Sequence, residues 1–200
     1  MAKNTDNREN ALSPSCREGE DVRLPHPLHL FRYCPECGSP HFVEHNAKSK
    51  HCEACGFTYY FNPSAATVAL IERPTANGGV EWLCVRRAKE PARGTLDLPG
   101  GFSDLYETSE EGICREVKEE TGLKVEGVEF LFSLPNQYLY SGFNVHTIDM
   151  FFRCSVAETS VARAADDAGE ILWLRPADIN PDDFGLASIR AGVKRLLSMD

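Results

Sequence analysis

A single segment near the middle of the chain constrains the fold most. It runs from Gly101 to Leu123 and reads GFSDLYETSEEGICREVKEETGL. Thr108 or Ser109 can cap the start of a helix, and acidic residues follow in the first turn, where negative charge suits the helix dipole. Gly122 can take the left-handed conformation that ends a helix. The segment therefore predicts one helix flanked by two loops.

The predicted helix carries three carboxylates on one face, because they stand at i, i+3 and i+4: Glu116, Glu119 and Glu120. Like charges this close repel one another unless a cation lies among them. Hard dications such as Mg²⁺ or Mn²⁺ prefer oxygen ligands, bind phosphate oxygens, activate water and offset charge on a leaving phosphate. The alternative is a solvated acidic helix face. The register of Gly100, Gly101, Glu107 and Arg115 around the helix favours the metal site.

Composition narrows the classes of protein. The chain has 200 residues, 42% of them hydrophobic, and a net charge of −9. This fits one domain with a small module, and the acidic balance argues against a nucleic-acid partner. No apolar run is long enough for a membrane span, and no signal peptide opens the chain. We expect a cytoplasmic protein without a membrane partner, whose residues 1–26 form a disordered tail.

Two cysteine pairs predict a zinc ribbon over residues 27–62. Cys34-Pro-Glu-Cys37-Gly and Cys52-Glu-Ala-Cys55-Gly are C-x-x-C-G knuckles. Four thiolates give closed tetrahedral coordination, which selects Zn²⁺. The alternative is a pair of disulfides, which a reducing compartment disfavours. Basic and acidic residues balance in this module, so we expect a structural or homodimer-forming role.

Residues 63–200 predict a second domain built on a sheet. Short apolar, β-branched runs read as strands, and the last run has helical spacing with one apolar face. The predicted strands are Ala65–Ile71, Trp82–Val85, Leu123–Phe132, His146–Val156 and Ile171–Leu174, and the helix is Leu186–Met199. This order predicts an α/β protein, an α/β/α sandwich with a mixed sheet.

Further residues near the predicted helix suit a phosphate substrate. A basic cluster lies just upstream of Leu98-Pro-Gly-Gly101 and is the place where an acidic protein is expected to bind substrate phosphates: Arg86, Arg87, Lys89 and Arg93. The alternative for part of this cluster is ordinary solvated charge at the end of a strand. Tyr138, Tyr140 and Phe143 could stack on a base, and packing at a strand edge is the equal alternative.

The segment from Gly101 to Leu123 resembles the Nudix box, G-x5-E-x7-R-E-U-x-E-E-x-G-U with U aliphatic, at every fixed position. Nudix hydrolases cleave nucleoside diphosphates linked to a second group X. The resemblance implies a pyrophosphohydrolase with a Nudix sandwich fold. It also implies catalytic roles for Arg115, Glu116, Glu119 and Glu120, and it makes the Gly100 carbonyl a backbone metal ligand. We expect Arg115 to fix the carboxylates by ion pairing with Glu107.

A ribbon before such a domain resembles the NADH pyrophosphatases. Their signature S-Q-P-W-P-F-P-x-S matches Ser133, Pro135 and Ser141 here, whereas Asn136 stands in place of the Trp and Tyr138 in place of the Phe. Glu170-x-x-Trp173 resembles their E-x-x-W, whose Glu is a further Mg²⁺ or Mn²⁺ ligand.

This resemblance implies that NADH, NAD or a similar dinucleotide is hydrolysed at its diphosphate bond. Two alternatives stay open. One is a pyrophosphatase for ADP-ribose or a nucleotide sugar, and the other is a non-catalytic nucleotide sensor or interaction module that keeps the fold. We expect the segment from Ser133 to Ser141 to form a loop that meets the base and ribose.

Overall fold

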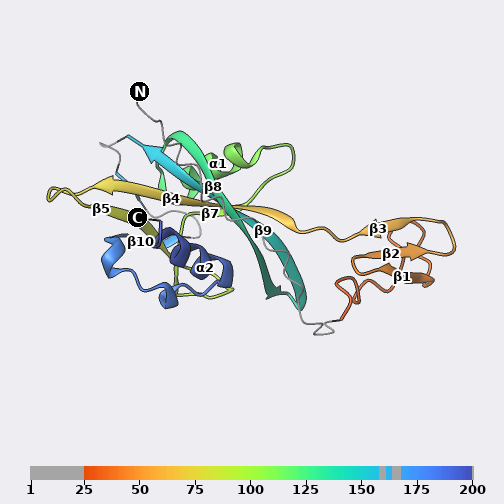
Figure 1. The fold of residues 1–200 in the computed structure, drawn as a ribbon. Coiled ribbons are helices and arrows are strands. Elements are labelled where there is room, and N and C mark those ends of the chain that lie inside the picture. The colour runs from red at the N-terminus through yellow and green to blue at the C-terminus, as the bar shows by residue number, and fades with distance from the viewer. Residues whose placement is uncertain (1–24, 158–160, 164–167, 200) are drawn as a thin grey trace, which may run out of the picture.

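The computed structural model describes residues 25–157, 161–163 and 168–199. The predicted tail, residues 1–26, lies almost entirely outside them. The chain folds into a small three-stranded sheet followed by a seven-stranded sheet with two α-helices (Figure 1). Within the described residues, no helix has both the length and the apolar character needed to cross a bilayer.

The small sheet contains β1 (Phe42–Asn46), β2 (Ser49–Cys52) and β3 (Thr58–Tyr60), paired antiparallel in that order. Only a few buried apolar side chains support it, namely Phe42 with Cys34 and Cys52, and Phe57 packs against them. A core this small supplies little free energy of folding, so the sheet needs another source of stability.

The larger sheet has the order β10-β5-β4-β9-β8. Its strands are β4 (Ser64–Pro74), β5 (Val80–Arg87), β8 (Val125–Tyr140), β9 (Phe143–Val156) and β10 (Ala168–Leu174). Short strands β6 (Leu96–Asp97) and β7 (Gly100–Phe102) pair with β5 and β4. The pairing of β4 with β9 is parallel and the others are antiparallel, so the sheet is mixed, as predicted.

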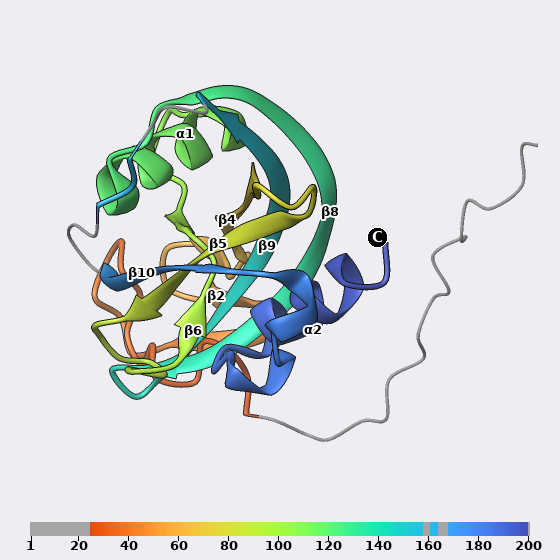
Figure 2. The ribbon, with the colours of Figure 1, turned by 90° about the vertical axis from the view of Figure 1, so that its left-hand side faces the viewer.

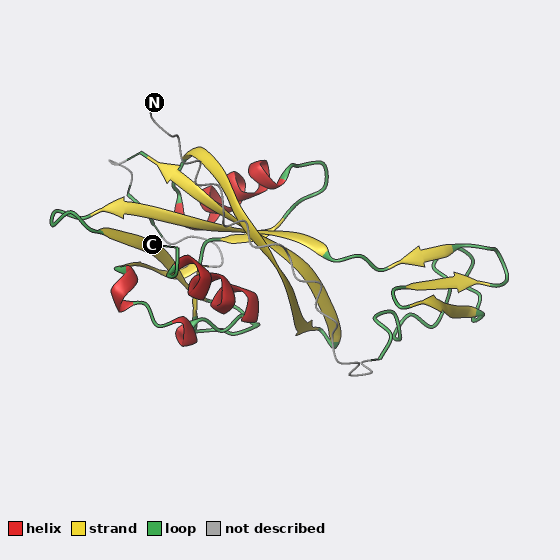
Figure 3. Ribbon diagram, viewed as in Figure 1, coloured by secondary structure: helices red, strands yellow, loops and turns green. Residues whose placement is uncertain are grey.

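Two helices cover opposite faces of this sheet (Figures 2 and 3). One core cluster joins Ile113 and Val117 of α1 (Ser109–Thr121) to Leu83 and Phe152. The other cluster joins α2 (Ala187–Leu196) to the alternate side chains of the same strands, such as Trp82 and Phe151. Short 3₁₀ turns, η1 (Pro176–Asp178) and η2 (Pro181–Asp183), lead into α2. The architecture is the predicted α/β/α sandwich.

The strands β8 and β9 form a hairpin longer than the sequence suggested. Its turn is Ser141-Gly142, with φ values of 51° and 75°, and the ladder pairs Tyr140 with Phe143 beside it. Two left-handed residues are typical of a type I′ turn, whose twist suits the flanking strands. The predicted loop from Ser133 to Ser141 is therefore wrong, because Ser133 to Tyr140 belong to β8.

The end of this hairpin contacts the small sheet and its flanking residues. The Phe143 ring lies 5.8 Å from Phe31 and 5.5 Å from Phe61, both edge to face. His146 lies 5.5 Å from Phe61. Phe143 is therefore committed to packing, the alternative that the sequence left open. These aromatic contacts connect the cysteine-bearing part of the chain to the larger sheet.

Candidate active site

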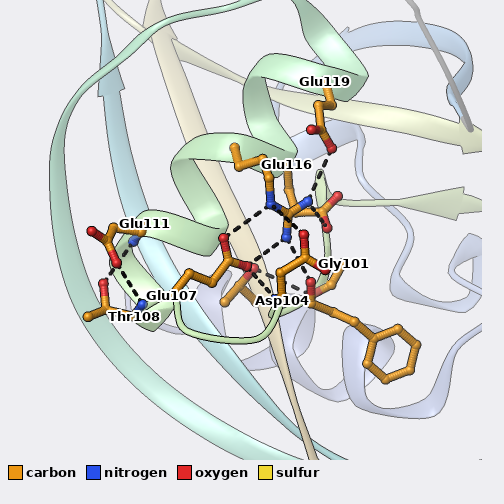
Figure 4. Close-up of polar contacts among 10 residues, drawn as sticks. Gly101, Asp104, Glu107, Thr108, Glu111, Glu116 and Glu119 are labelled. Carbon is orange, nitrogen blue, oxygen red and sulfur yellow. Dashed lines mark hydrogen bonds and ion pairs between the residues drawn. The ribbon is translucent and has the colours of Figure 1, made fainter.

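The carboxylate helix is fixed at both ends by its own residues. Thr108 Oγ1 accepts a hydrogen bond from Glu111 N at 3.2 Å, and Glu111 Oε2 accepts one from Thr108 N at 2.8 Å. This capping box satisfies two backbone donors at the start of α1 (Figure 4). Gly122 ends the helix at φ 70°, as predicted.

Arg115 is the centre of the polar network beside the helix, and its partners Glu107, Glu116 and Glu119 are labelled in Figure 4. Its guanidinium donates to both oxygens of Glu107, at 3.2 Å and 2.7 Å, so the expected ion pair is present. It also donates to Glu116 at 2.8 Å, to Glu119 at 3.1 Å and to the Phe102 carbonyl at 3.0 Å. The hydrogen bonds from Arg115 lower the pKa of Glu107. One planar group thus joins the loop before α1 to two of the helix carboxylates.

The three helix carboxylates point in two directions. Glu120 Oε2 accepts a hydrogen bond from Gly100 N at 3.1 Å, and a Cβ built on Gly101 would lie 2.6 Å from the Glu116 carboxyl group. These two side chains therefore face the Gly100-Gly101 backbone. Glu119 turns to Arg115 and is half exposed. Within the described residues, the three do not form a cluster with all ligand oxygens within 4.8 Å.

Opposing electrostatic effects act on Glu116. Burial raises its pKa, Arg115 opposes that rise, and the like charges of Glu119 and Glu107 add to it. A carboxylate pressed by desolvation and by neighbouring anions suits a hard cation as partner. Glu116 and Glu120, which both lie against the Gly100-Gly101 backbone, therefore fit Mg²⁺ or Mn²⁺.

A cavity of about 460 Å³ opens beside these residues. Gly100, Gly101 and Glu120 line one part of it, and side chains of the β8–β9 hairpin line another. Tyr138 and Tyr140 are among them, so the structure brings both predicted tyrosines to the same cavity as Glu120. The volume is in the range of small-molecule sites.

The sequence interpretation did not single out the buried polar residues of this cavity as site residues. They are Thr67, Asp97, Asn136, Thr147 and Asp149, each less than a tenth exposed. Asp149 accepts hydrogen bonds from Thr147 Oγ1 at 2.5 Å and from Ser188 Oγ of α2. The available signal was a charged residue in the middle of an apolar strand, since Ile148 and Met150 flank Asp149.

Two arginines of the predicted phosphate-binding cluster have protein partners. Arg87 lines the cavity, but it donates to Asp97 Oδ2 at 2.5 Å and to the Pro91 carbonyl at 2.7 Å. Arg86 donates to Glu170 at 2.9 Å and to the Gly94 carbonyl at 3.0 Å, and it lies outside the cavity lining. Both side chains hold the segment after β5 in place, so the geometry favours a positioning role over direct phosphate contact.

Glu170 has a protein partner on the neighbouring strand. It pairs with Arg86 of β5, and Leu172 on the same face of β10 packs in the core cluster that contains α2. Ile171 and Trp173, on the other face, pack in the cluster that contains α1. Because a strand presents alternate residues to opposite faces, the Glu and the Trp of E-x-x-W lie on different sides of β10. A role for Glu170 as a metal ligand stays a prediction.

The four ribbon cysteines converge on one point. Their sulfurs lie within 4.8 Å of one another, with 3.7 Å between Cys34 and Cys55 and 3.6 Å between Cys37 and Cys52. Four ligands at the usual Zn–S distance would be about 3.8 Å apart in a tetrahedron. The sulfurs are too far apart for disulfides. This donor set could hold zinc.

Comparison with known proteins agrees with the geometry. A model of the NUDIX domain matches residues 62–195. The NAD-capped RNA hydrolase NudC of Chromobacterium violaceum is 35% identical over 106 residues, which cover 53% of this chain and 38% of that protein. The ADP-ribose pyrophosphatase of Methanocaldococcus jannaschii is 34% identical over 116 residues, which cover 57% of this chain and 63% of that protein. The chain thus spans less than two thirds of the length of these relatives.

A solved structure shows the same fold. The NUDIX hydrolase from Nitrosomonas europaea superposes with a TM-score of 0.62 at 22% identity, over 84% of this chain and 90% of that one. The sequence box, the helix that carries it and the family match all fall within the same two thirds of the chain. The chain belongs to the Nudix domain family.

Proposed function

We propose that the protein hydrolyses the diphosphate bond of a nucleoside diphosphate linked to a second group X. The observation that supports this most is the arrangement around Gly100 and Gly101, where Glu116 and Glu120 face a glycine backbone at the edge of the cavity. An intact set of carboxylates is needed for metal-assisted phosphate chemistry, whereas a simple nucleotide binder does not need it.

We propose Mg²⁺ or Mn²⁺ as the cofactor, held by Glu116 and Glu120 with the Gly100 carbonyl. The metal, when bound, would activate water and offset charge on the leaving phosphate. Arg115 would hold the orientation of Glu116 through the 2.8 Å hydrogen bond. Glu119, which is half exposed and bound to Arg115, remains a candidate for ligand or general base.

We propose a dinucleotide such as NADH or NAD, or ADP-ribose, as the substrate. The relatives named as NAD-capped RNA hydrolases and as an ADP-ribose pyrophosphatase support an ADP-X compound. The cavity supports it too, because it extends from Glu120 to Tyr138 and Asp149 and so offers space beyond the diphosphate. Asn136 in place of the signature Trp removes a large ring from this space, which should reduce discrimination among X groups.

We propose a structural zinc ion at Cys34, Cys37, Cys52 and Cys55. The near-tetrahedral spacing of the sulfurs supports it, and so does the small core of the ribbon. A closed shell of four thiolates leaves no position for substrate, so this ion would stabilise the fold and take no part in hydrolysis.

A panel of substrates tests the proposal. Purified protein is supplied with Mg²⁺ or Mn²⁺ and offered NADH, ADP-ribose, a 5′-NAD-capped oligonucleotide and a nucleoside triphosphate. The products are separated and measured: AMP from the first two, nicotinamide mononucleotide and a 5′-monophosphate oligonucleotide from the third, and the nucleoside mono- or diphosphate from the last. We expect AMP from NADH and ADP-ribose with little contrast between them. Turnover of the nucleoside triphosphate alone would reject the proposal. If metal-bound protein turns over none of them, the non-catalytic sensor becomes the better account.

A further inference from the structure

One part of the cavity is polar, buried and unrelated to the phosphate chemistry. It lies on the β8–β9 ladder, where Asn136 pairs with Thr147 and the next pair on the same face joins Leu134 to Asp149. Asn136 and Asp149 are therefore diagonal neighbours on one face, with Cα atoms about 7–8 Å apart. Their side chains are 9% and 4% exposed and both line the cavity.

Asp149 offers hydrogen-bond acceptors to this cavity. Each of its two oxygens already accepts one hydroxyl donor, Thr147 from β9 and Ser188 from α2. A carboxylate has about four acceptor positions, so roughly two remain.

Asn136 offers a donor. Its Oδ1 accepts a hydrogen bond from Gln137 N at 2.9 Å, which identifies that atom as the oxygen. The other amide atom, Nδ2, is then an NH₂ group with two protons to donate. This NH₂ group donates no hydrogen bond to another of the described residues, and Asn136 lines the cavity.

The charges nearby disfavour a phosphate at this place. Two cations, Arg87 and Lys89, line the cavity, and Arg87 is already paired with Asp97 through a 2.5 Å ion pair. Asp149 therefore adds a negative charge that Arg87 does not balance. Burial raises the pKa of Tyr138, and the negative charge of Asp149 raises it further. A neutral ligand part with a hydrogen-bond donor fits here better than an anion.

We infer that Asp149 and Asn136 select the nucleobase, and that the base they select is adenine. The Asp149 carboxylate would accept a hydrogen bond from the exocyclic amino group, and the Asn136 amide would donate to the unprotonated ring nitrogen beside it. Hypoxanthine presents a carbonyl oxygen where adenine has the amino group. This oxygen and the carboxylate are both hydrogen-bond acceptors, so they would repel each other. The inference rests on the proposed function only in placing a nucleotide in this cavity.

Binding of AMP and IMP tests the inference without any turnover. The two ligands differ at the base edge alone, and titration calorimetry on the full-length protein with Mg²⁺ gives both affinities. We expect AMP to bind on the order of 10- to 100-fold more tightly, as for a hydrogen bond to a buried charged group. Equal affinities, or tighter binding of GMP than of AMP, would overturn the inference.

Three variants separate base selection from a structural role. Asp149→Asn should bring the AMP/IMP ratio to within about threefold, because an amide can also donate to a carbonyl. Asn136→Leu should weaken AMP binding about 10-fold. Ser188→Ala is the matched control, since it breaks the link between Asp149 and α2 but keeps the carboxylate, and we expect its ratio to stay near that of the unmodified protein.

The outcomes also separate this inference from the proposed hydrolysis. A large AMP/IMP ratio in a protein that hydrolyses nothing would support base selection and reject the hydrolase. Equal hydrolysis of ADP-ribose and its hypoxanthine analogue would reject base selection and support the hydrolase. Two results would show that Asp149 has only the structural role of linking β9 to α2. One is loss of the ratio in Ser188→Ala as complete as in Asp149→Asn. The other is an unchanged ratio in both Asp149→Asn and Asn136→Leu when these variants are folded.

Discussion

Gly100 is the residue at which the backbone leaves no room for a side chain. Its φ is 153°, and a Cβ built there would lie 2.0 Å from the Thr67 carbonyl oxygen. Because that oxygen belongs to the backbone of β4, it cannot move away from an added Cβ without distorting the sheet. Close approach of the two strands also brings Gly100 N within 3.1 Å of Glu120. The position therefore links the packing of the sheet to the orientation of a carboxylate.

We expect Gly100→Ala to lower the free energy of unfolding by about 3 kcal/mol or more, because steric overlap and backbone strain act together. Gly122→Ala is the matched control. Its φ is also positive, at 70°, but nothing lies within 4 Å of the built Cβ, so the expected loss is about 1–2 kcal/mol. Urea unfolding of both variants measures the difference, and equal losses would show that contact with Thr67 is unimportant.

Glu120→Gln should remove most of the catalytic rate and leave the fold intact. Glutamine keeps an oxygen that can accept from Gly100 N, but it loses the charge that would hold a dication. A decrease in kcat on the order of 10³-fold is expected, as for other groups essential to the chemical step. Steady-state rates with the best substrate of the panel, together with circular dichroism, provide the check. A folded variant with near-normal turnover would show that this helix face is not the metal site.

At the scale of elements, α1 depends on its first turn. Thr108 and Glu111 satisfy backbone donors at the start of the helix that carries the carboxylates. Thr108→Ala should therefore lower the free energy of unfolding by about 1 kcal/mol. Glu110→Ala is the control, because Glu110 is exposed and contributes only through the helix dipole, about 0.3–1 kcal/mol. Chemical denaturation of both variants tests this, and a Thr108→Ala loss below that of the control would contradict it.

The sequence predicts α1 well and the β8–β9 hairpin poorly, for a physical reason. Local signals decide where α1 begins and ends, since the cap Thr108 and the stop Gly122 are its immediate neighbours in the chain. Ser133, Pro135 and Asn136 favour a loop on local grounds, but pairing with β9 overrides that preference. Pro135 is tolerated because β8 is at the edge of the sheet, where a missing N–H breaks no second ladder.

The candidate site likewise contains residues whose contacts the sequence predicts and residues whose contacts it does not. The box residues Glu107, Arg115, Glu116 and Glu120 are close in sequence, and their spacing on a loop and helix predicts their contacts. Glu170 and the arginine pair depend on which strands are neighbours and which face each side chain takes. Asp149 meets Ser188 across 39 residues, and no local pattern encodes that contact. A single sequence thus does not reveal which residues far apart in the chain are in contact.

At the scale of the whole molecule, the ribbon and the larger sheet draw on different sources of stability. The larger part has two apolar clusters, whereas the ribbon has a handful of buried side chains around its cysteines. Their contact through Phe31, Phe61 and Phe143 is aromatic and small. The two parts should therefore lose structure separately when the metal is removed.

We expect Cys52→Ser to abolish binding of one zinc per chain and to unfold the ribbon, while α1 and the larger sheet remain. Elemental analysis and hydrogen exchange measured along the chain detect these effects. Cys114→Ser is the control, because Cys114 lies on α1 and should leave the zinc content at one. Protein without zinc before any substitution, or cooperative loss of both parts in Cys52→Ser, would contradict the expectation.

The two-residue turn at Ser141-Gly142 sets limits on how this protein can change over generations. Side chains alternate along β8 and β9, so Asn136, Tyr138 and Asp149 reach the cavity only in the present register. A substitution at any of them alters one contact and leaves the others in place. Insertion or deletion of a single residue at the turn would rotate a whole strand and replace the cavity wall at once. Descendants of this chain can therefore acquire new ligands by exchange of side chains, but not by changes in the length of this hairpin.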